Sequence, residues 1–361
     1  MSDYTTRPIS ALPKGVAFAR AALALMVAQG DTRKAAGFAD SRWRDSPATV
    51  TYLKSAVVSG STIDSEWGGP LAEYDHASAE FSELLRNGSI LGKLTGARRV
   101  PFGVRYPQQT AASSVAWVGQ SAPAPVSELA FQTATIGFAK VSGIVAFSNE
   151  LVESASPDVE GLVKNDLLKS AIEFLDAQFV NPGVTAVINV SPGSITSGIT
   201  AVQSTGSTAT QIAADLAALA TQLADANETD SLYWIMSRSD AVRLAAKRGT
   251  DGSSAFPGVT ATGGILLGIP IIASNAVPHT VSAGSVVVLV NASGIDYADN
   301  NLLQLSISAE ASLQMNSTPD AGAQALVSLF QINAAAVRLT KLANWQRRRA
   351  TAVAVLDNAH W

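Results

Sequence analysis

The feature that most limits how this chain can fold is the stretch from Trp117 to Val180. In it, a ribbon of small residues leads into strand-like alternation and then into a long helix. The ribbon, WVGQSAPAPV at 117–126, has two prolines and few large apolar side chains, so it cannot form a core of its own. Together with strand-like residues at 100–106 and 114–118 it fits a hairpin, and an isolated hairpin is only marginally stable in water. We therefore expect the ribbon to lie on another body, most naturally a neighbouring copy of the chain. A disordered loop is the alternative.

The helix expected after the ribbon has the clearest end signals in the sequence. Ser156 is a suitable N-cap, Pro157 occupies the first helical position, and acidic residues in the first turn favour the positive end of the helix dipole. Apolar residues then recur at helical spacing until an Asn-Pro-Gly sequence at 181–183 ends the pattern. Residues 157–181 are thus predicted to form one helix about 37 Å long, which suits a structural strut.

Composition leaves open what covers the surface. Hydrophobic residues make up 47% of the 361 residues and charged residues only 15%, against about 25% charged residues in average proteins. Either partners cover much of the surface, or Ala, Ser, Thr and Gly simply stand in place of charge. The net charge of −4 argues against a dedicated nucleic-acid binder, which needs a basic stripe to neutralise phosphates. This net charge still allows a container wall that faces nucleic acid without binding it tightly.

Cysteine content and hydropathy exclude further classes. The chain has no cysteine, so disulfides, thiolate metal sites and a cysteine nucleophile are ruled out. The apolar segment at 16–28 is too short to span a bilayer and contains Arg20. No small-residue cleavage site follows it, so we interpret it as an amphipathic helix rather than a signal peptide. We expect a soluble protein with no membrane partner.

The other expected elements follow one another irregularly. The first 90 residues have little strand character and are predicted to form an extended arm with short helices. Helices are predicted at 209–226 and 238–249, and a buried strand at 231–237. Further apolar strands are expected in GGILLGIPIIAS and GSVVVLVNAS, and a pair of long strands in LLQLSISAEASLQMN and ALVSLFQINAAAVRLT. Because helices and strands interleave without regular βαβ spacing, the predicted fold class is α+β.

Few residues carry catalytic or metal-binding chemistry. The histidines, His76, His279 and His360, form no pair at metal-ligand spacing, and no HExxH motif is present. A Ser–His–Asp triad could use His279, but the chain has no GxSxG elbow. The sequence GSILGKL at 88–94 lacks the P-loop spacing and the Ser or Thr that should follow Lys93. We therefore expect no catalytic residue, no metal site and no cofactor.

Two basic clusters remain, Arg98-Arg99 and Arg347-Arg348-Arg349. The simplest interpretation of each is a solvated strand end. As functional residues they would form ion pairs between subunits or contact nucleic acid. The negative net charge favours the inter-subunit role.

The order of these parts resembles the major capsid protein family of tailed phages, with the Hong Kong 97-type fold, from about Leu91 to Leu356. Residues 117–152 look like the second strand of the family's E-loop leading into the peripheral domain, and residues 156–181 look like its spine helix. Residues 231–256 with 263–278 are similar to the strand, helix and strand of the axial domain. Residues 305–341 are similar to the long peripheral hairpin.

The resemblance implies an N-terminal arm at 1–90 and an E-loop hairpin at 91–130. It also implies a peripheral domain at 131–195 with 303–341, which includes the spine helix 157–181, and an axial domain at 196–302 with 342–357. The E-loop would lie over the adjacent subunit. The candidate inter-subunit contacts are Trp117, Gln120, Pro123, Pro125, Arg98, Arg99, Arg347, Arg348 and Arg349.

The function implied by the resemblance is that of a structural protein rather than an enzyme. The chain would self-assemble as hexamers and pentamers into the icosahedral head of a tailed double-stranded DNA phage and enclose its genome. Its partners would be other copies, the portal protein, scaffolding or decoration proteins where the phage uses them, and packaged DNA through weak non-specific contacts. The shell would assemble in the host cytoplasm, and the chain would then be part of the virion.

Two alternatives and one departure from the family accompany this interpretation. An encapsulin-type shell protein of a bacterial nanocompartment has the same fold, although the N-terminal 90 residues favour the phage. An enzyme of unknown type is the third class. Some relatives form covalent cross-links from an E-loop lysine, whereas Gly119–Phe131 contains no lysine. We therefore expect no such cross-links.

Overall fold

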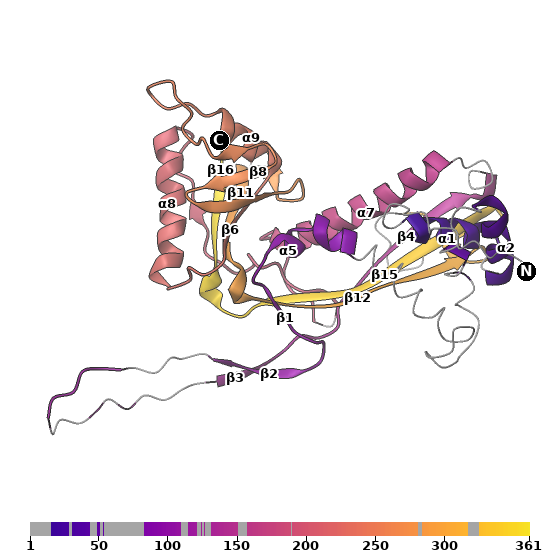
Figure 1. Cartoon of the computed structure of the whole chain (residues 1–361), viewed down its shortest axis with the longest axis horizontal. Coiled ribbons are helices and arrows are strands. Elements are labelled where there is room, and N and C mark those ends of the chain that lie inside the picture. The colour runs from indigo at the N-terminus through magenta and orange to yellow at the C-terminus, as the bar shows by residue number, and fades with distance from the viewer. Residues whose placement is uncertain are drawn as a thin grey trace, which may run out of the picture. The chain divides into compact units, whose positions relative to one another are not determined.

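The computed structural model describes residues 16–28, 31–43, 49–50, 53, 83–109, 115–120, 124, 126, 131–150, 157–188, 190–280, 284–316 and 325–361. The chain divides into two compact units, and Figure 1 labels many of their elements. The first unit contains Met1–Gly92, Lys140–Leu175 and Asn301–Leu342. The second contains Lys93–Ala139, Asp176–Asn300 and Ala343–Trp361.

Two segments of the second unit directly adjoin the first unit in sequence. They are 93–139, which includes the base of the hairpin, and 176–195, which begins near the end of the long helix.

Packing inside the second unit explains why both segments belong to it. Tyr106 and Ile136, at the two sides of the hairpin base, are buried in one cluster with Ala298. Phe179, near the end of the long helix, meets Trp345 edge-on with ring centroids 5.4 Å apart. These contacts join segments that are distant in sequence, so local patterns do not indicate them.

The first unit contains a pair of packed helices, α1 (Val16–Val27) and α2 (Thr32–Arg42). Most of their buried residues are alanines, whose small side chains let helices approach closely. Asp31 caps α2 by accepting the backbone N–H groups of Arg33 and Lys34 at 3.0 and 3.2 Å. These bonds, that of Lys34 first, lower the pKa of the Asp31 carboxyl.

The long helix α7 runs from Pro157 to Val180 and so ends one residue before the expected 181. The expected N-cap, Ser156, lies outside the described residues. At the other end, the Val180 carbonyl accepts the Thr196 hydroxyl at 2.7 Å, which satisfies one of the carbonyls that a helix end leaves open. The Asn181 side chain accepts a backbone N–H two residues on, at 3.0 Å, and so shapes the turn that ends the helix.

A four-stranded sheet has the order β1-β12-β15-β4. Its members are β1 (Arg98–Arg99), β12 (Ile295–Ser308), β15 (Ala334–Arg347) and β4 (Lys140–Ser148). β15 and β4 are antiparallel, from Ala334 opposite Ser148 to Leu342 opposite Lys140. β1 instead runs parallel to the start of β12.

The long strand expected in ALVSLFQINAAAVRLT is shorter than the pattern suggests. β15 begins only at Ala334, and the preceding residues form a turn after the small ribbon of β13 (Ser312–Leu313) and β14 (Val327–Ser328). Asn333 has a φ of 49°, a left-handed conformation that asparagine tolerates better than most residues and that breaks an extended strand.

The second unit is built on a mixed sheet of order β5-β16-β11-β6-β9-β8-β7, with β10 also paired to β11. β11 is antiparallel to both β16 and β6, whereas β6 is parallel to β9. The ranges are β5 (Val202–Gln203), β6 (Leu232–Met236), β7 (Val259–Thr260), β8 (Gly263–Leu266), β9 (Ile269–Ala273), β10 (His279–Thr280), β11 (Gly284–Asn291) and β16 (Val353–Ala359). The shorter elements are α5 (Ile90–Lys93), η2 (Ala292–Gly294) and η3 (Ala350–Ala352).

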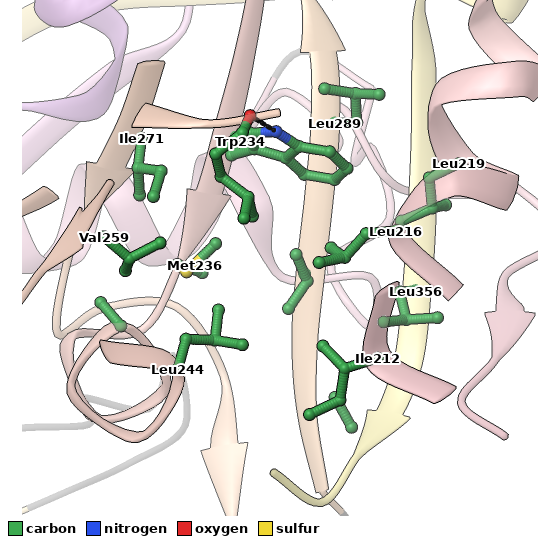
Figure 2. Packing of buried hydrophobic residues seen from close by; sticks show 14 of the residues in the cluster. Ile212, Leu216, Leu219, Trp234, Met236, Leu244, Val259, Ile271, Leu289 and Leu356 are labelled. Carbon is green, nitrogen blue, oxygen red and sulfur yellow. Dashed lines mark hydrogen bonds between the residues drawn. The ribbon is translucent and has the colours of Figure 1, made fainter. Parts of the chain in front are cut away.

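Two helices, α8 (Ala209–Asp225) and α9 (Arg238–Ala246), contribute to one hydrophobic core with this sheet. α8 presents Ile212, Leu216 and further leucines at helical spacing, and Thr208 and Gln211 form a capping box at its start. Figure 2 shows the indole of Trp234 among side chains of α8 and the sheet, with its Nε1–H donating to the Leu266 carbonyl at 3.1 Å. β11 is buried along its whole length, so both faces of the sheet are covered at this central strand.

Candidate functional site

The hairpin whose strands are β2 (Arg105–Gln109) and β3 (Phe131–Thr135) is here named the arm. It begins as a two-stranded antiparallel ribbon, with its strands drawn side by side in Figure 1. Its base is anchored through Tyr106. The Tyr106 hydroxyl donates to Asp296 Oδ2 at 2.8 Å and accepts the Gln346 amide at 2.5 Å. Because these partners lie on β12 and β15, the arm is tied to the strands beside it.

The tip of the arm is open to solvent. Every residue from Val115 to Gln120 is exposed, and Trp117 has an exposed fraction of 105%. An aromatic side chain that could bury about 150–250 Å² is therefore left in water, and tryptophan is a residue type enriched at interfaces. Pro123 and Pro125 lie outside the described residues, so their predicted contacts have no structural description.

The first basic cluster, Arg98-Arg99, lies on exposed strand β1. The Arg98 guanidinium lies 5.1 Å from the centre of the Tyr106 ring, a cation–π arrangement at the arm base. The Arg99 Nη2 donates to the Asp299 carbonyl at 2.6 Å. Both arginines are thus partly engaged within the chain, and their contact with a second subunit stays a prediction.

The second basic cluster, Arg347 to Arg349, is half-buried rather than a solvated strand end. Arg347 donates to the Ser197 carbonyl at 2.7 Å, and burial lowers the pKa of its guanidinium. Arg348 donates to the Ser293 carbonyl at 2.5 Å. The structure therefore gives these arginines intrachain partners, while their inter-subunit role stays a prediction.

Arg349 forms an ion pair with the buried carboxylate of Glu228. The Glu228 side chain is 3% exposed, and Arg349 Nε and Nη2 both approach its carboxylate. Asn291 donates to the same carboxylate at 2.7 Å and Thr351 at 3.3 Å. No sequence signal marks this ion pair, because a glutamate in the loop after a helix normally lies in water.

Replacing Arg349 with methionine is expected to lower the free energy of unfolding by about 3 kcal/mol. The substitution keeps the aliphatic stem but leaves a buried carboxylate without its cation. Urea denaturation measures the loss. The matched variant Arg349→Met with Glu228→Gln should lose less than Arg349→Met alone, because no buried charge is left unpaired. Equal losses for the two variants would show that the ion pair is not the cause.

Tyr106 links the arm base to pH. Burial, followed by the hydrogen bond to Asp296, raises the pKa of Tyr106 from 10.0 to about 12. The folded chain thus favours the neutral phenol. The contribution of the neutral Tyr106 phenol to the stability of the fold is complete below pH 10 and is lost as the pH rises through 12.

Replacing Tyr106 with phenylalanine is expected to lower stability at pH 7 by about 1–3 kcal/mol, since the buried Asp296 carboxylate loses a donor. The variant should also lose less stability than the parent chain between pH 10 and 12. Urea midpoints at both ends of that range test this. Parallel pH curves for the two chains would rule out Tyr106 as the titrating group.

Ser285, His279 and Asp240 lie together but do not form a usable nucleophilic site. The Ser285 hydroxyl donates to Asp240 Oδ1 at 2.9 Å and contacts His279 Nδ1. Ser285 is fully buried, so a substrate cannot reach its hydroxyl. The cluster instead ties β10 and β11 to the start of α9.

Neither metal-ligand clusters nor membrane-crossing helices occur within the described residues. No group of three or more His, Asp or Glu side chains there is placed to hold a metal ion. No helix of that part of the chain is long and apolar enough to cross a bilayer. His76 lies outside the described residues.

Solved structures from phages have the same fold as this chain. Structures from Mycobacterium phages Bobi and Ogopogo each match 75% of this chain, and 90% and 92% of their own chains. Their TM-scores are 0.57 and 0.55, at sequence identities of 15% and 21%. Similarity at these identities shows the fold alone. These structures therefore share the α+β fold seen here.

Sequence comparison identifies the family. A profile of the phage capsid family matches residues 69–358. The capsid polyprotein of Pseudomonas phage PAJU2 is 38% identical over 365 residues, which cover 97% of this chain and 55% of that protein. The major capsid protein of Klebsiella oxytoca phage phiKO2 is 25% identical, over 84% of this chain and 71% of that protein. The chain belongs to the phage capsid family, and it spans about half the length of the PAJU2 polyprotein.

Proposed function

We propose that this chain is a major capsid protein that self-assembles into the icosahedral head of a tailed double-stranded DNA phage and encloses its genome. The observation that carries the proposal is the family match over residues 69–358, joined to the capsid fold. The relatives named above are phage proteins, which favours the phage head over the encapsulin alternative. The role is structural, with no catalytic activity.

The parts of the chain take the roles that the resemblance implies. Residues 1–90 form an N-terminal arm, 91–130 the E-loop, and 131–195 with 303–341 the peripheral domain. Residues 196–302 with 342–357 form the axial domain. The anchored base and exposed tip of the β2–β3 arm support the E-loop role, because such an arm gains contacts only on another body.

The proposed partners follow from a closed shell. Copies associate as hexamers and pentamers, one vertex holds a portal protein, and scaffolding or decoration proteins join where the phage uses them. Packaged DNA makes weak, non-specific contacts, in keeping with the net charge of −4. The shell assembles in the host cytoplasm and becomes part of the virion.

Sedimentation velocity of the purified chain tests this function. A capsid protein should give a narrow, fast-sedimenting boundary together with free subunits or capsomers. Nuclease-protected DNA in shells from infected cells separates a phage head from a protein-filled compartment. A chain that sediments only as a monomer under all assembly conditions would contradict the proposal.

Assembled shells are expected to dissociate completely into single chains when boiled in detergent. No lysine occurs between Gly119 and Phe131, so the arm has no amine with which to form an isopeptide bond. Denaturing gel electrophoresis of purified shells should show one band at 37.3 kDa. A ladder of covalent oligomers would show that a lysine elsewhere takes this role.

A further inference from the structure

The second unit contains an open groove of about 630 Å³. Its three walls are residues 135–139, which include the end of β3, the turn at 186–194, and residues 344–347 at the end of β15. The volume lies within the range of about 300–1,000 Å³ that is typical of binding pockets. Arg347 is the one charged residue among the described residues that line the groove.

Hydrogen bonds hold the walls of the groove together. The Asn344 side chain donates to the Gly137 carbonyl at 2.7 Å, and the Trp345 indole N–H donates to the Gly193 carbonyl at 2.9 Å. The segment 344–347 is therefore joined to both of the other walls. A groove that is formed before its ligand arrives loses less entropy on binding than one that the ligand must order.

Arg347 brings a half-buried positive charge to this groove. Burial lowers the pKa of its guanidinium, and no carboxylate in the part of the chain that the structure describes forms an ion pair with it. Arginine keeps its proton in proteins, so the side chain remains a cation. Charges withdrawn from water are normally paired with an opposite charge. The described residues do not supply that charge, which indicates an anionic ligand.

The Arg347 guanidinium also has hydrogen-bond donors to offer. One of its five N–H groups donates to the Ser197 carbonyl at 2.7 Å, and no second bond is made to a described residue. The planar guanidinium binds a carboxylate or a phosphate through two parallel N–H···O bonds. The free donors of Arg347 therefore suit either oxyanion.

The rim of the groove decides between these two anions, because it is apolar and exposed. Phe138, Val187, Ile188 and Val190 have exposed fractions of 62%, 52%, 87% and 62%. Since these side chains line one groove and are not scattered singly, they form a patch of the kind that marks interaction sites. A ligand that covers this patch must itself carry large apolar groups beside its anion.

A nucleic acid meets these requirements poorly. Its affinity for a protein comes mainly from several phosphates that meet several cations, whereas the described lining of this groove has a single cation. Its phosphates would also leave the apolar rim uncovered. A peptide in which an acidic residue lies beside large apolar residues satisfies both the cation and the rim.

We propose that this groove binds an acidic, apolar peptide segment of a partner protein. An Asp or Glu carboxylate of the peptide lies on Arg347, and its neighbouring apolar side chains cover Phe138, Ile188 and Val190. The site goes beyond the proposed shell function, because it lies within one copy of the chain and its ligand needs no assembled shell.

Selection from a library of random heptapeptides displayed on yeast tests this specificity. The library is first depleted on the Arg347→Met chain and then selected on the full parent chain. We expect an acidic residue next to Phe, Leu, Ile or Trp at least threefold more often in the selected peptides than in the starting library. Selected peptides without this enrichment would overturn the proposal.

Fluorescence anisotropy with the strongest selected peptide measures the contact itself. A peptide with Asn or Gln in place of its acidic residue should bind the parent at least tenfold more weakly. Arg347→Met should bind both peptides equally weakly, whereas Arg347→Lys, which keeps the charge but loses the planar fork, should have an intermediate affinity. Equal affinity of the parent for the two peptides would contradict the role of Arg347.

Ile188→Ser tests the apolar rim without changing Arg347. Because the Ile188 side chain is exposed, the variant should fold and melt like the parent, so the test holds even if Arg347→Met does not fold. We expect at least fivefold weaker peptide binding. Val242→Ser, at an exposed apolar position on α9 that does not line the groove, is the matched control and should bind like the parent.

Two other results would replace the proposed ligand. If oligothymidylate displaces the peptide from the parent but not from Arg347→Met, the groove is a nucleic-acid site. If the groove instead receives a second copy, Ile188→Ser should abolish self-association of the purified chain in sedimentation velocity while no peptide is enriched. Either result would overturn the proposal, and neither peptide experiment depends on shell formation.

Discussion

Replacing Trp234 with alanine is expected to lower the free energy of unfolding by about 3–5 kcal/mol, a large part of the roughly 5–15 kcal/mol that stabilises a typical folded protein. Trp234 is fully buried at the centre of the second unit's core, next to Leu216 and Leu289 (Figure 2). Its loss leaves a large cavity and removes the donor to the Leu266 carbonyl. Urea denaturation followed by circular dichroism measures the change.

Trp117→Ala is the matched control, because it makes the same chemical change at a fully exposed position. It should change the free energy of unfolding by no more than about 0.5 kcal/mol. If Trp234→Ala is as stable as Trp117→Ala, the hydrophobic cluster described here is not the core of the unit.

Removal of the arm tip is expected to abolish shell formation without unfolding the chain. In the variant, residues 115–126 are replaced by a short Gly-Ser turn that keeps the β2–β3 ladder closed. The deleted residues that the structure describes are all exposed, so their loss removes no core contact. Electron microscopy should show no shells, and the thermal midpoint should match that of the parent.

A variant with the same turn that still forms normal shells would show that the arm is not the assembly element. Val242→Ala serves as the control for a general effect of trimming exposed apolar surface, and it should assemble like the parent. Loss of folding in the arm variant, seen as a lower thermal midpoint, would show instead that the arm contributes to the subunit's own stability.

Several elements could be predicted from the sequence because their signals are local. The helix α7 lies within one residue of its expected end, since an Asn-Pro-Gly sequence terminates it. α8 occupies 209–225 against an expected 209–226, since its apolar residues recur at helical spacing. Membership of the phage capsid family could also be predicted, because the resemblance depends on the order of such elements along the chain. The family match over residues 69–358 confirms this prediction.

Other features could not be predicted, because they depend on contacts between distant residues. The pair of Glu228 and Arg349 joins a loop to a strand end far along the chain, and each residue alone has the pattern of a solvated surface group. The groove lined by residues 135–139, 186–194 and 344–347 likewise forms from three separate segments. The start of β15 at Ala334 depends on the left-handed Asn333, which an alternating pattern does not reveal.

Cryo-electron microscopy of the purified parent chain at high concentration tests the central claim most directly. Closed icosahedral shells are expected, with density for residues 115–120 lying on an adjacent subunit rather than in solvent. Compact single particles of 37.3 kDa, with Trp117 packed against its own chain, would contradict the account.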